Sequence, residues 1–241
     1  MNAQEKKLIY SLLKTADAFL CGYTRKEFQN EMIFEEDKIK NTICDKVFSP
    51  TDDTTLGELS AKIIRCTRCN LARTRNNVVP GEGVPNPDVI VIGEAPGYDE
   101  DMQGRPFVGK AGMLLDKMLD AIQLDRKTNC FIANIVKCRP PENRNPFPDE
   151  QSACFSFLEA QISILKPKMI LCMGKVAIEK LIDQKISVTA SHGQFFDYKG
   201  IPVMVTYHPS ALLRNQELKR PAWEDLKKFK SKLSEMKANS V

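Results

Sequence analysis

The stretch of sequence that decides the fold runs from Val89 to Leu115 and reads VIVIGEAPGYDEDMQGRPFVGKAGMLL. It begins with a short apolar run that ends at Gly93, which is typical of a fully buried strand. A loop rich in glycine and proline follows, and the stretch closes with apolar residues at helical spacing. Strand, glycine-rich loop and helix in this order place the loop at the carboxyl end of a sheet strand, where open α/β sheets bind ligands.

The loop carries four acidic residues and one isolated aromatic residue. The acids are Glu94, Asp99, Glu100 and Asp101, whose negative charges would repel a phosphate group held here. Phe107 stands between polar and glycine residues, where an ordinary loop gains little from an aromatic side chain. Together these residues predict a pocket for a flat, polar, uncharged ring. Taken singly, the acids could be solvated or cap the following helix, and Phe107 could be a loop anchor.

Further strands and helices follow along the chain. Apolar runs at Phe131–Val136 and Lys168–Met173 predict buried strands, and Phe195–Thr206 predicts a hairpin that turns at Lys199-Gly200. The segments between them have helical periodicity. Strands that alternate with helices predict an α/β protein, a three-layer α/β/α sandwich around a mainly parallel central sheet of about four strands.

The carboxyl ends of parallel strands share one edge of a sheet, so Glu94, Asn134 and His208 are expected to lie close together. Asn134 sits inside an apolar strand, where its amide is costly unless it is hydrogen-bonded. The amide either joins a network with a neighbouring loop backbone or reads the edge of a ligand. A lone histidine is more often structural than catalytic. The position of His208 at a strand end, between Tyr207 and Pro209, favours the functional alternative.

A change in composition near Ser49–Asp53 divides the chain. This segment combines proline with short polar residues and predicts a linker. We therefore expect an N-terminal helical extension at residues 1–55, with an apolar face at Leu8–Leu20, and a main domain at residues 56–241. Thr54-Thr55 is the expected N-cap of the first helix of the main domain.

Composition favours an intracellular, cytoplasmic protein with no membrane partner. No apolar run approaches the roughly 18 residues of a membrane span, and the charged start of the chain does not resemble a signal peptide. The charge is uneven, with 8 basic against 10 acidic residues in 1–55, which leaves 27 against 21 in 56–241. A basic main domain is compatible with nucleic acid as a partner, although mild basicity alone is a weak indication.

Four of the eight cysteines form a candidate metal site. Cys66 and Cys69 are separated by two residues, a spacing that lets both thiolates face one metal. Cys138 and Cys154 stand at element ends, Cys154 in a helix for which Asp149 is the expected N-cap. Four thiolates suit zinc or an iron–sulfur cluster, and spacing alone does not separate the two. The remaining cysteines lie in apolar contexts and are expected to be packing residues: Cys21, Cys44, Cys130 and Cys172.

Taken together, these motifs closely resemble those of the family 4 uracil-DNA glycosylases, the iron–sulfur members of their superfamily. The resemblance runs from about Leu56 to Lys230. It rests on GEAPGYDEDMQGRPFVGKAG at 93–112, NIVKCRPPENR at 134–144, YHPSALLR at 207–214 and the layout of the four cysteines.

The resemblance implies that the protein flips uracil out of single- or double-stranded DNA and hydrolyses its N-glycosidic bond, leaving an abasic site for base excision repair. It implies that the ring stacks on Phe107, that Asn134 reads the O4/N3 edge and that His208 donates to O2. It also implies a 4Fe–4S cluster on the four cysteines of the candidate site: Cys66, Cys69, Cys138 and Cys154.

Other family positions have less certain roles in this sequence. Glu94 and Glu100 are both candidates for placing the attacking water or stabilising the cationic sugar. Related single-domain enzymes use an aspartate where this chain has Ala95, whose backbone is expected to hold the ring edge. The resemblance assigns Asn143 to support of the pocket. It assigns two further residues to phosphate contacts: Ser210 and Arg214.

Two rivals come from other classes of protein. One is a cluster-bearing nucleic-acid-binding module that recognises uracil without excising it. The other is a zinc-stabilised hydrolase of free nucleosides or nucleotides, which the absence of a GxxxxGK[ST] loop disfavours. One relative in the superfamily becomes covalently trapped on the abasic sugar through a histidine in an inserted basic loop. This chain has no histidine and no insertion between Cys138 and Cys154, so the resemblance implies turnover. We expect a monomer, with residues 1–55 available to a protein partner.

Overall fold

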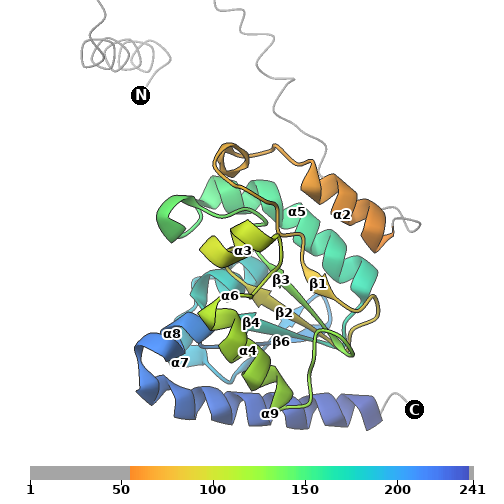
Figure 1. Ribbon diagram of the computed structural model, residues 1–241. Helices are drawn as coiled ribbons and strands as arrows, with labels where there is room; N and C mark the ends of the chain where they lie inside the picture. The colour runs from red at the N-terminus through yellow and green to blue at the C-terminus, as the bar shows by residue number, and fades with distance from the viewer. Residues whose placement is uncertain (1–54, 239–241) are drawn as a thin grey trace, which may run out of the picture. The chain divides into compact units, whose positions relative to one another are not determined.

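A computed structural model describes residues 55–238 of the chain (Figure 1). The predicted N-terminal extension, with its apolar face at Leu8–Leu20 and two of the cysteines, lies outside the described residues. The division at residue 55 therefore stays a prediction.

The centre of the described part is one sheet of six strands in the order β1-β3-β2-β4-β6-β5. Four strands, β3, β2, β4 and β6, run parallel to one another, whereas β1 and β5 are antiparallel edge strands. The mainly parallel sheet is confirmed, but it has two more strands than the expected four because each edge adds one. The strands are β1 (Glu82–Gly83), β2 (Val89–Gly93), β3 (Cys130–Asn134), β4 (Met169–Met173), β5 (Phe195–Tyr198) and β6 (Ile201–Thr206).

Helices connect the strands and cover both faces of the sheet. The α-helices are α2 (Leu56–Ile64), α3 (Tyr98–Gln103), α4 (Lys110–Asp120), α5 (Pro148–Leu165), α6 (Lys175–Ile182), α7 (Val188–Ser191), α8 (Pro209–Arg214) and α9 (Lys219–Ala238). Within residues 55–238 there are three short 3-10 helices, η3 (Asn70–Arg73), η4 (Pro141–Asn143) and η5 (Gln216–Leu218). Among the helices at residues 55–238, none has the length and apolar character needed to cross a bilayer.

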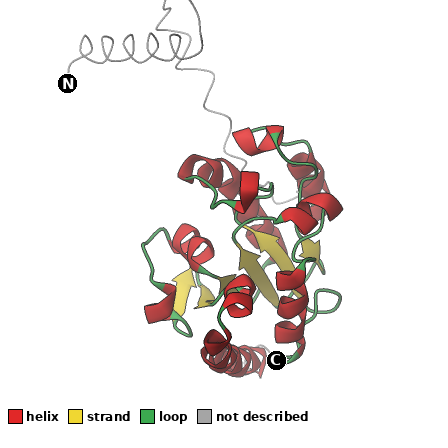
Figure 2. Ribbon diagram, turned by 60° about the vertical axis from the view of Figure 1, so that its left-hand side comes forward, coloured by secondary structure: helices red, strands yellow, loops and turns green. Residues whose placement is uncertain are grey.

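Alternate residues of β2 show how the layers are built. Ile90 and Ile92 belong to a core formed with α2, α5 and α6, while Val89 and Val91 belong to a second core formed with α4, α8 and α9. All four side chains are fully buried, as a central parallel strand requires. The sheet therefore lies between two helical layers, which confirms the three-layer α/β/α sandwich (Figures 1 and 2).

Local capping agrees with the sequence at α2 and departs from it at α5. Thr55 caps α2 as expected, because its hydroxyl accepts a hydrogen bond from the Glu58 N–H and the Glu58 carboxylate returns one to the Thr55 N–H. The expected N-cap of α5 was wrong. Phe147 holds that position instead of Asp149, because Pro148 fixes the first helical residue and keeps its predecessor extended.

The register of the parallel strands aligns their carboxyl ends at one edge of the sheet. Gly93 at the end of β2 pairs with Asn134 at the end of β3, and Met173 of β4 pairs with Thr206 of β6. Gly174 follows β4 with φ of +91° and faces the Cβ of His208, so this position favours glycine over any residue with a side chain. Four parallel strands thus end at one edge of the sheet.

Candidate active site and cysteine cavity

A cavity of about 430 Å³ lies at this edge of the sheet. The ends of β2, β3, β4 and β6 all contribute to its wall. All nine residues that the sequence assigned to catalysis and substrate binding line it: Glu94, Ala95, Glu100, Phe107, Asn134, Asn143, Ser210, His208 and Arg214. The structure therefore brings the whole predicted set together around one space.

Asn134 contributes an unsatisfied polar atom to the wall of this cavity. Its side chain is 2% exposed, and no described residue supplies a hydrogen bond to Oδ1. An unpaired buried oxygen is costly in a folded protein, and most such atoms have a partner. Among the described residues, Oδ1 therefore makes no network with the neighbouring loop backbone. The alternative role, in which the amide reads the edge of a ligand, stays a prediction.

His208 is held in one tautomer by the residues that follow it. The Ser210 N–H donates to Nδ1 over 3.2 Å, and Ser210 Oγ lies 2.8 Å from the same nitrogen. An N–H donor at Nδ1 leaves the ring proton on Nε2. Burial, with the charge of Arg214 acting in the same direction, lowers the pKa of His208 to about 4. The imidazole is therefore neutral at pH 7 and carries one donor at Nε2.

Phe107 is placed in the cavity by contacts behind it. Its backbone has φ of +51°, and its ring centroid lies 5.6 Å from that of His208. Arg126 is 7% exposed at its side chain and donates to the carbonyl oxygens of Pro106 (2.8 Å) and Phe107 (3.0 Å). Gly112 faces the Phe107 carbonyl, where a Cβ would not fit. These contacts fix the loop, and Phe107, which is 6% exposed, both packs in the core and lines the cavity.

The four acids of the loop divide into different environments. Glu100 accepts three backbone hydrogen bonds, from Gly97 over 3.1 Å and from Val108 and Gly109 over 2.9 Å each. Asp101 is buried and accepts from the backbone at residues 76–77. Both carboxylates therefore hold the loop. Asp99 is exposed to solvent.

Glu94 differs from these three acids. No described residue donates a hydrogen bond to its carboxylate, and burial raises its pKa above the usual range. Among the candidates for handling water, Glu94 is therefore the acid in the cavity wall with free lone pairs.

Three polar residues of the cavity wall were not singled out from the sequence. Lys175 directly follows Gly174 at the end of β4, so the strand-end rule that located Glu94 and Asn134 would have found it. Arg144 closes one of the quoted motifs, and Asn145 is its neighbour. Arg144 is fixed by Glu150, whose two carboxylate oxygens it contacts over 2.8 and 2.7 Å.

A second, smaller cavity gathers the four cysteines predicted as metal ligands. Cys66, Cys69, Cys138 and Cys154 all line it, whereas Cys130 and Cys172 are fully buried in the cores, as expected of packing residues. Three basic side chains line the same cavity: Arg68, Arg75 and Lys137. The segment before η3, the loop after β3 and the start of α5 therefore meet around four thiols.

Two of the basic residues are held beside the four thiols by hydrogen bonds. Arg75 donates to Sγ of Cys138 over 3.0 Å and to the carbonyl oxygen of Cys66 over 2.8 Å. Lys137 is 1% exposed and donates to Gln161 and to the carbonyl oxygen of Asn134 over 2.9 Å. Lys137 thus lies between the cysteine cavity and a residue of the larger cavity.

Comparison with known proteins identifies the family. Residues 80–227 match the family model described as the uracil DNA glycosylase superfamily. A type-4 uracil-DNA glycosylase of Thermotoga maritima is 46% identical over 177 residues, which cover 72% of this chain and 92% of the relative. Enzymes of the same name from Sulfurisphaera tokodaii (42%; 73% of this chain and 83% of the relative) and Archaeoglobus fulgidus (37%; 72% and 91%) are also similar. The chain belongs to the uracil DNA glycosylase superfamily and, within it, to the type-4 enzymes.

Proposed function

We propose that this uracil-DNA glycosylase binds a flipped uracil in the larger cavity and hydrolyses its N-glycosidic bond there. The observation that carries the proposal is the unpaired Oδ1 of Asn134, buried in a cavity that also presents an aromatic ring and a neutral histidine. Uracil has an N3–H donor that would satisfy this oxygen. Stacking on Phe107 and edge contacts would offset the few kcal/mol that extrusion of a base costs.

Selectivity against cytosine follows from the same amide. Asn134 accepts from N3–H through Oδ1 and donates to O4 through its amide nitrogen. Cytosine has a bare N3 and an exocyclic amine in these places, so both hydrogen bonds are lost. A site that leaves its own buried polar groups unpaired rejects the wrong ligand strongly.

His208 would assist departure of the base. Cleavage of the bond between C1′ and N1 leaves both electrons on uracil, which becomes negative, while the sugar gains oxocarbenium character. A neutral imidazole with its proton on Nε2 donates to O2 more strongly as that charge grows, so it stabilises the transition state more than the ground state. Water then adds to C1′ and releases a proton, leaving an abasic site.

Glu94 is our candidate for orienting that water. Its carboxylate is free of hydrogen bonds from the described residues, while Glu100 is engaged with three backbone N–H groups. The neighbouring side chain is only the methyl group of Ala95, which leaves room for a water beside the backbone. Ser210 and Arg214 line the same cavity, and we propose that they contact DNA phosphates.

We further propose that the cysteine cavity holds a 4Fe–4S cluster. The donor set consists of thiols alone, which fits zinc or iron–sulfur chemistry. Within residues 55–238, no three His, Cys, Asp or Glu side chains are placed to hold a single metal ion. The choice of an iron–sulfur cluster over zinc rests on the resemblance to the family 4 enzymes, which implies a 4Fe–4S cluster on these four cysteines. When bound, it would link the segments at residues 66–69, 138 and 154 and stabilise the wall of the larger cavity.

The remaining proposals concern partners and place of action. We propose that the enzyme acts as a monomer. Free thiol ligands persist in reducing compartments, which supports action inside the cell on uracil-containing DNA. Residues 1–55 would be available to a protein partner, and removal of residues 1–49 with full activity retained would fit a role outside catalysis.

Strand cleavage at uracil tests the activity. Anaerobically purified protein is incubated with an excess of labelled oligonucleotide containing one uracil, and abasic sites are then cleaved with alkali. Multiple turnovers at uracil, with none at cytosine in the same context, are expected. Binding of the oligonucleotide without cleavage, by protein of full iron content, would instead favour a module that recognises uracil and does not excise it.

A further inference from the structure

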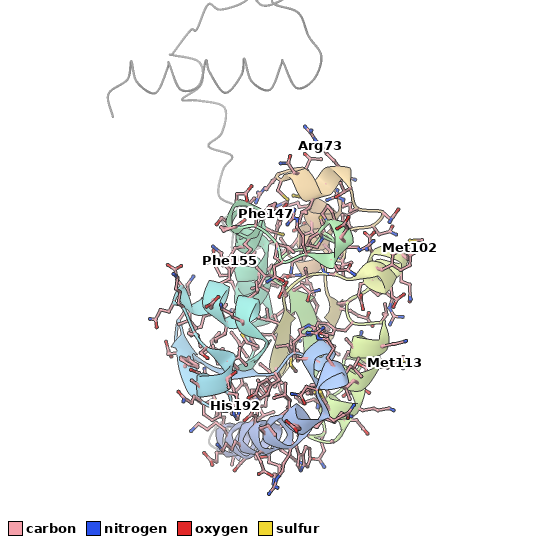
Figure 3. All side chains as sticks on the ribbon, turned by 90° about the vertical axis from the view of Figure 1, so that its left-hand side faces the viewer. Arg73, Met102, Met113, Phe147, Phe155 and His192 are labelled. Atoms are coloured by element: carbon pink, nitrogen blue, oxygen red, sulfur yellow. The ribbon has the colours of Figure 1, made fainter. Side chains whose placement is uncertain are left out.

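We propose that Phe147 is a stacking platform for a base of the uracil-containing strand within two nucleotides of the uracil. The inference rests on the proposed function, since it adds a subsite beside the uracil cavity. Phe147 precedes α5, is 53% exposed and does not line the cavity itself. Figure 3 labels it at the surface where α5 begins, on the side of the molecule that also presents α8.

The aromatic ring is connected to the cavity wall by one arginine. The guanidinium carbon of Arg144 lies 3.7 Å from the centroid of the Phe147 ring, and Arg144 is itself a wall residue of the uracil cavity. Arg144 covers one face of the ring, so the opposite face and the ring edges account for the exposed surface. Only the Arg144 side chain therefore separates the cavity from the Phe147 ring, so a DNA strand whose uracil enters the cavity would pass close to the open face of that ring.

The pair is held rigidly by a buried carboxylate. Glu150 is 2% exposed and accepts from the Phe147 N–H over 2.7 Å as well as from both terminal nitrogens of Arg144. Pro146 and Pro148 flank Phe147 and restrict the backbone on both sides. The backbone of Phe147 is therefore held by the Glu150 hydrogen bond and by the two prolines, and Arg144, which the same carboxylate binds, lies over one face of the ring.

A single exposed apolar side chain needs no explanation by itself. Preorganisation beside a DNA-binding cavity changes that judgement, because a fixed ring stacks on a base with little further loss of freedom. Extrusion of uracil removes a stacking neighbour from the adjacent bases, and an aromatic face restores one. Stacking of this kind tolerates any base, which suits an enzyme that must act in any sequence.

The test combines protein variants with modified single-stranded substrates. Phe147→Ala is compared with the unaltered protein on a uracil oligonucleotide, and Phe195→Ala, a change at a 41% exposed phenylalanine of β5 that does not line the uracil cavity, is the matched control. We expect Phe147→Ala to raise the KM at least about fivefold, the lower end for loss of one stacked base. Phe147→Trp should restore it, whereas Phe147→Leu, which is apolar but lacks a π-face, should not.

Substrates with an abasic spacer locate the partner base. A spacer is placed in turn at each of the two positions on either side of the uracil. If the spacer replaces the base that stacks on Phe147, the unaltered protein loses the same contact that Phe147→Ala lacks. On that one substrate the KM values of the two proteins should therefore be equal. An unchanged KM for Phe147→Ala, full restoration by Phe147→Leu, or a difference that persists with every spacer would each overturn the platform. Failure of the glycosylase proposal would be distinct, because the unaltered protein would then excise no uracil.

Discussion

Nδ1 of His208 accepts a 3.2 Å hydrogen bond from the backbone N–H of Ser210, two residues further along the chain. The turn that begins α8 thus decides which ring nitrogen faces the cavity with a proton. A protonated imidazole would place a second N–H against the Ser210 N–H, so the turn and burial act together to keep His208 neutral.

The protonation state of His208 can be measured directly. Because its pKa is lowered from 6.5 to about 4, His208 should remain neutral at pH 5.5, with Nδ1 as the acceptor. An unfolded chain binds a proton here below about pH 6.5, so this residue makes the free energy of unfolding rise with pH between about 4 and 6.5. Imidazole ¹⁵N shifts report the state, and a His192→Gln variant assigns the signals of the two histidines. Half-protonation of His208 near pH 6.5 would contradict the geometry.

Asn134→Asp should weaken uracil excision and relax the exclusion of cytosine. The carboxylate loses the donor to O4 and offers acceptors to the exocyclic amine of cytosine. The ratio of kcat/KM for uracil against cytosine, on otherwise identical oligonucleotides, should fall by about tenfold or more, as expected for the loss of one buried hydrogen bond to a ligand. Unchanged selectivity would remove Asn134 from the reading of the base edge.

Glu94→Gln and Glu100→Gln should have different effects. The Glu94 carboxylate has no hydrogen bonds to lose from the described residues, so its replacement should lower kcat while the melting temperature stays nearly constant. The Glu100 carboxylate accepts hydrogen bonds from three backbone N–H groups, and the amide of glutamine has only one, uncharged acceptor oxygen. Glu100→Gln should therefore destabilise the loop by about 1–3 kcal/mol. Because the same loop carries Phe107, the KM should rise. Thermal unfolding and steady-state kinetics of both variants check this division, and the reverse pattern would make Glu100 the residue that handles water.

Cys66→Ser should lose iron together with folded protein. A serine hydroxyl is a poor replacement for a thiolate, and the site joins segments from three parts of the chain. Cys172→Ala is the matched control, because Cys172 is buried in the core and does not line the cysteine cavity. The Cys172→Ala protein should therefore keep its full iron content. Iron content per folded protein and visible absorption distinguish the two variants. Normal yield of Cys66→Ser with full iron content would exclude Cys66 from the ligand set.

The sequence predicted the strand ends well for a physical reason. Central parallel strands are buried on both faces, so β2 and β4 appear as uninterrupted apolar runs, and the residues that follow them are placed by topology. The edge strand β1 has two residues in a proline- and glycine-rich connection and leaves no periodic pattern. Its pairing with β3 depends on a contact with residues 131–132, far along the chain.

The sequence did not predict the structural roles of residues whose partners lie far away along the chain. Arg126 lies in a polar turn, and nothing in its neighbourhood indicates that it binds the carbonyl of Phe107. Glu100 was expected in the cavity, but the backbone groups that its carboxylate binds lie 8 and 9 residues further on. The prediction of Asp149 as a cap failed because the restriction imposed by Pro148 outweighs the capping preference of the aspartate.

The most direct test of the account is the single-turnover excision rate of His208→Ala, measured together with its affinity for uracil-containing DNA. Removal of one preorganised donor should slow excision roughly 10²–10³-fold while the Kd for DNA changes little. His192→Ala, at the histidine outside the cavity wall, should retain the rate. A loss of DNA binding as large as the loss of rate would show that His208 is structural and contradict its role at uracil O2.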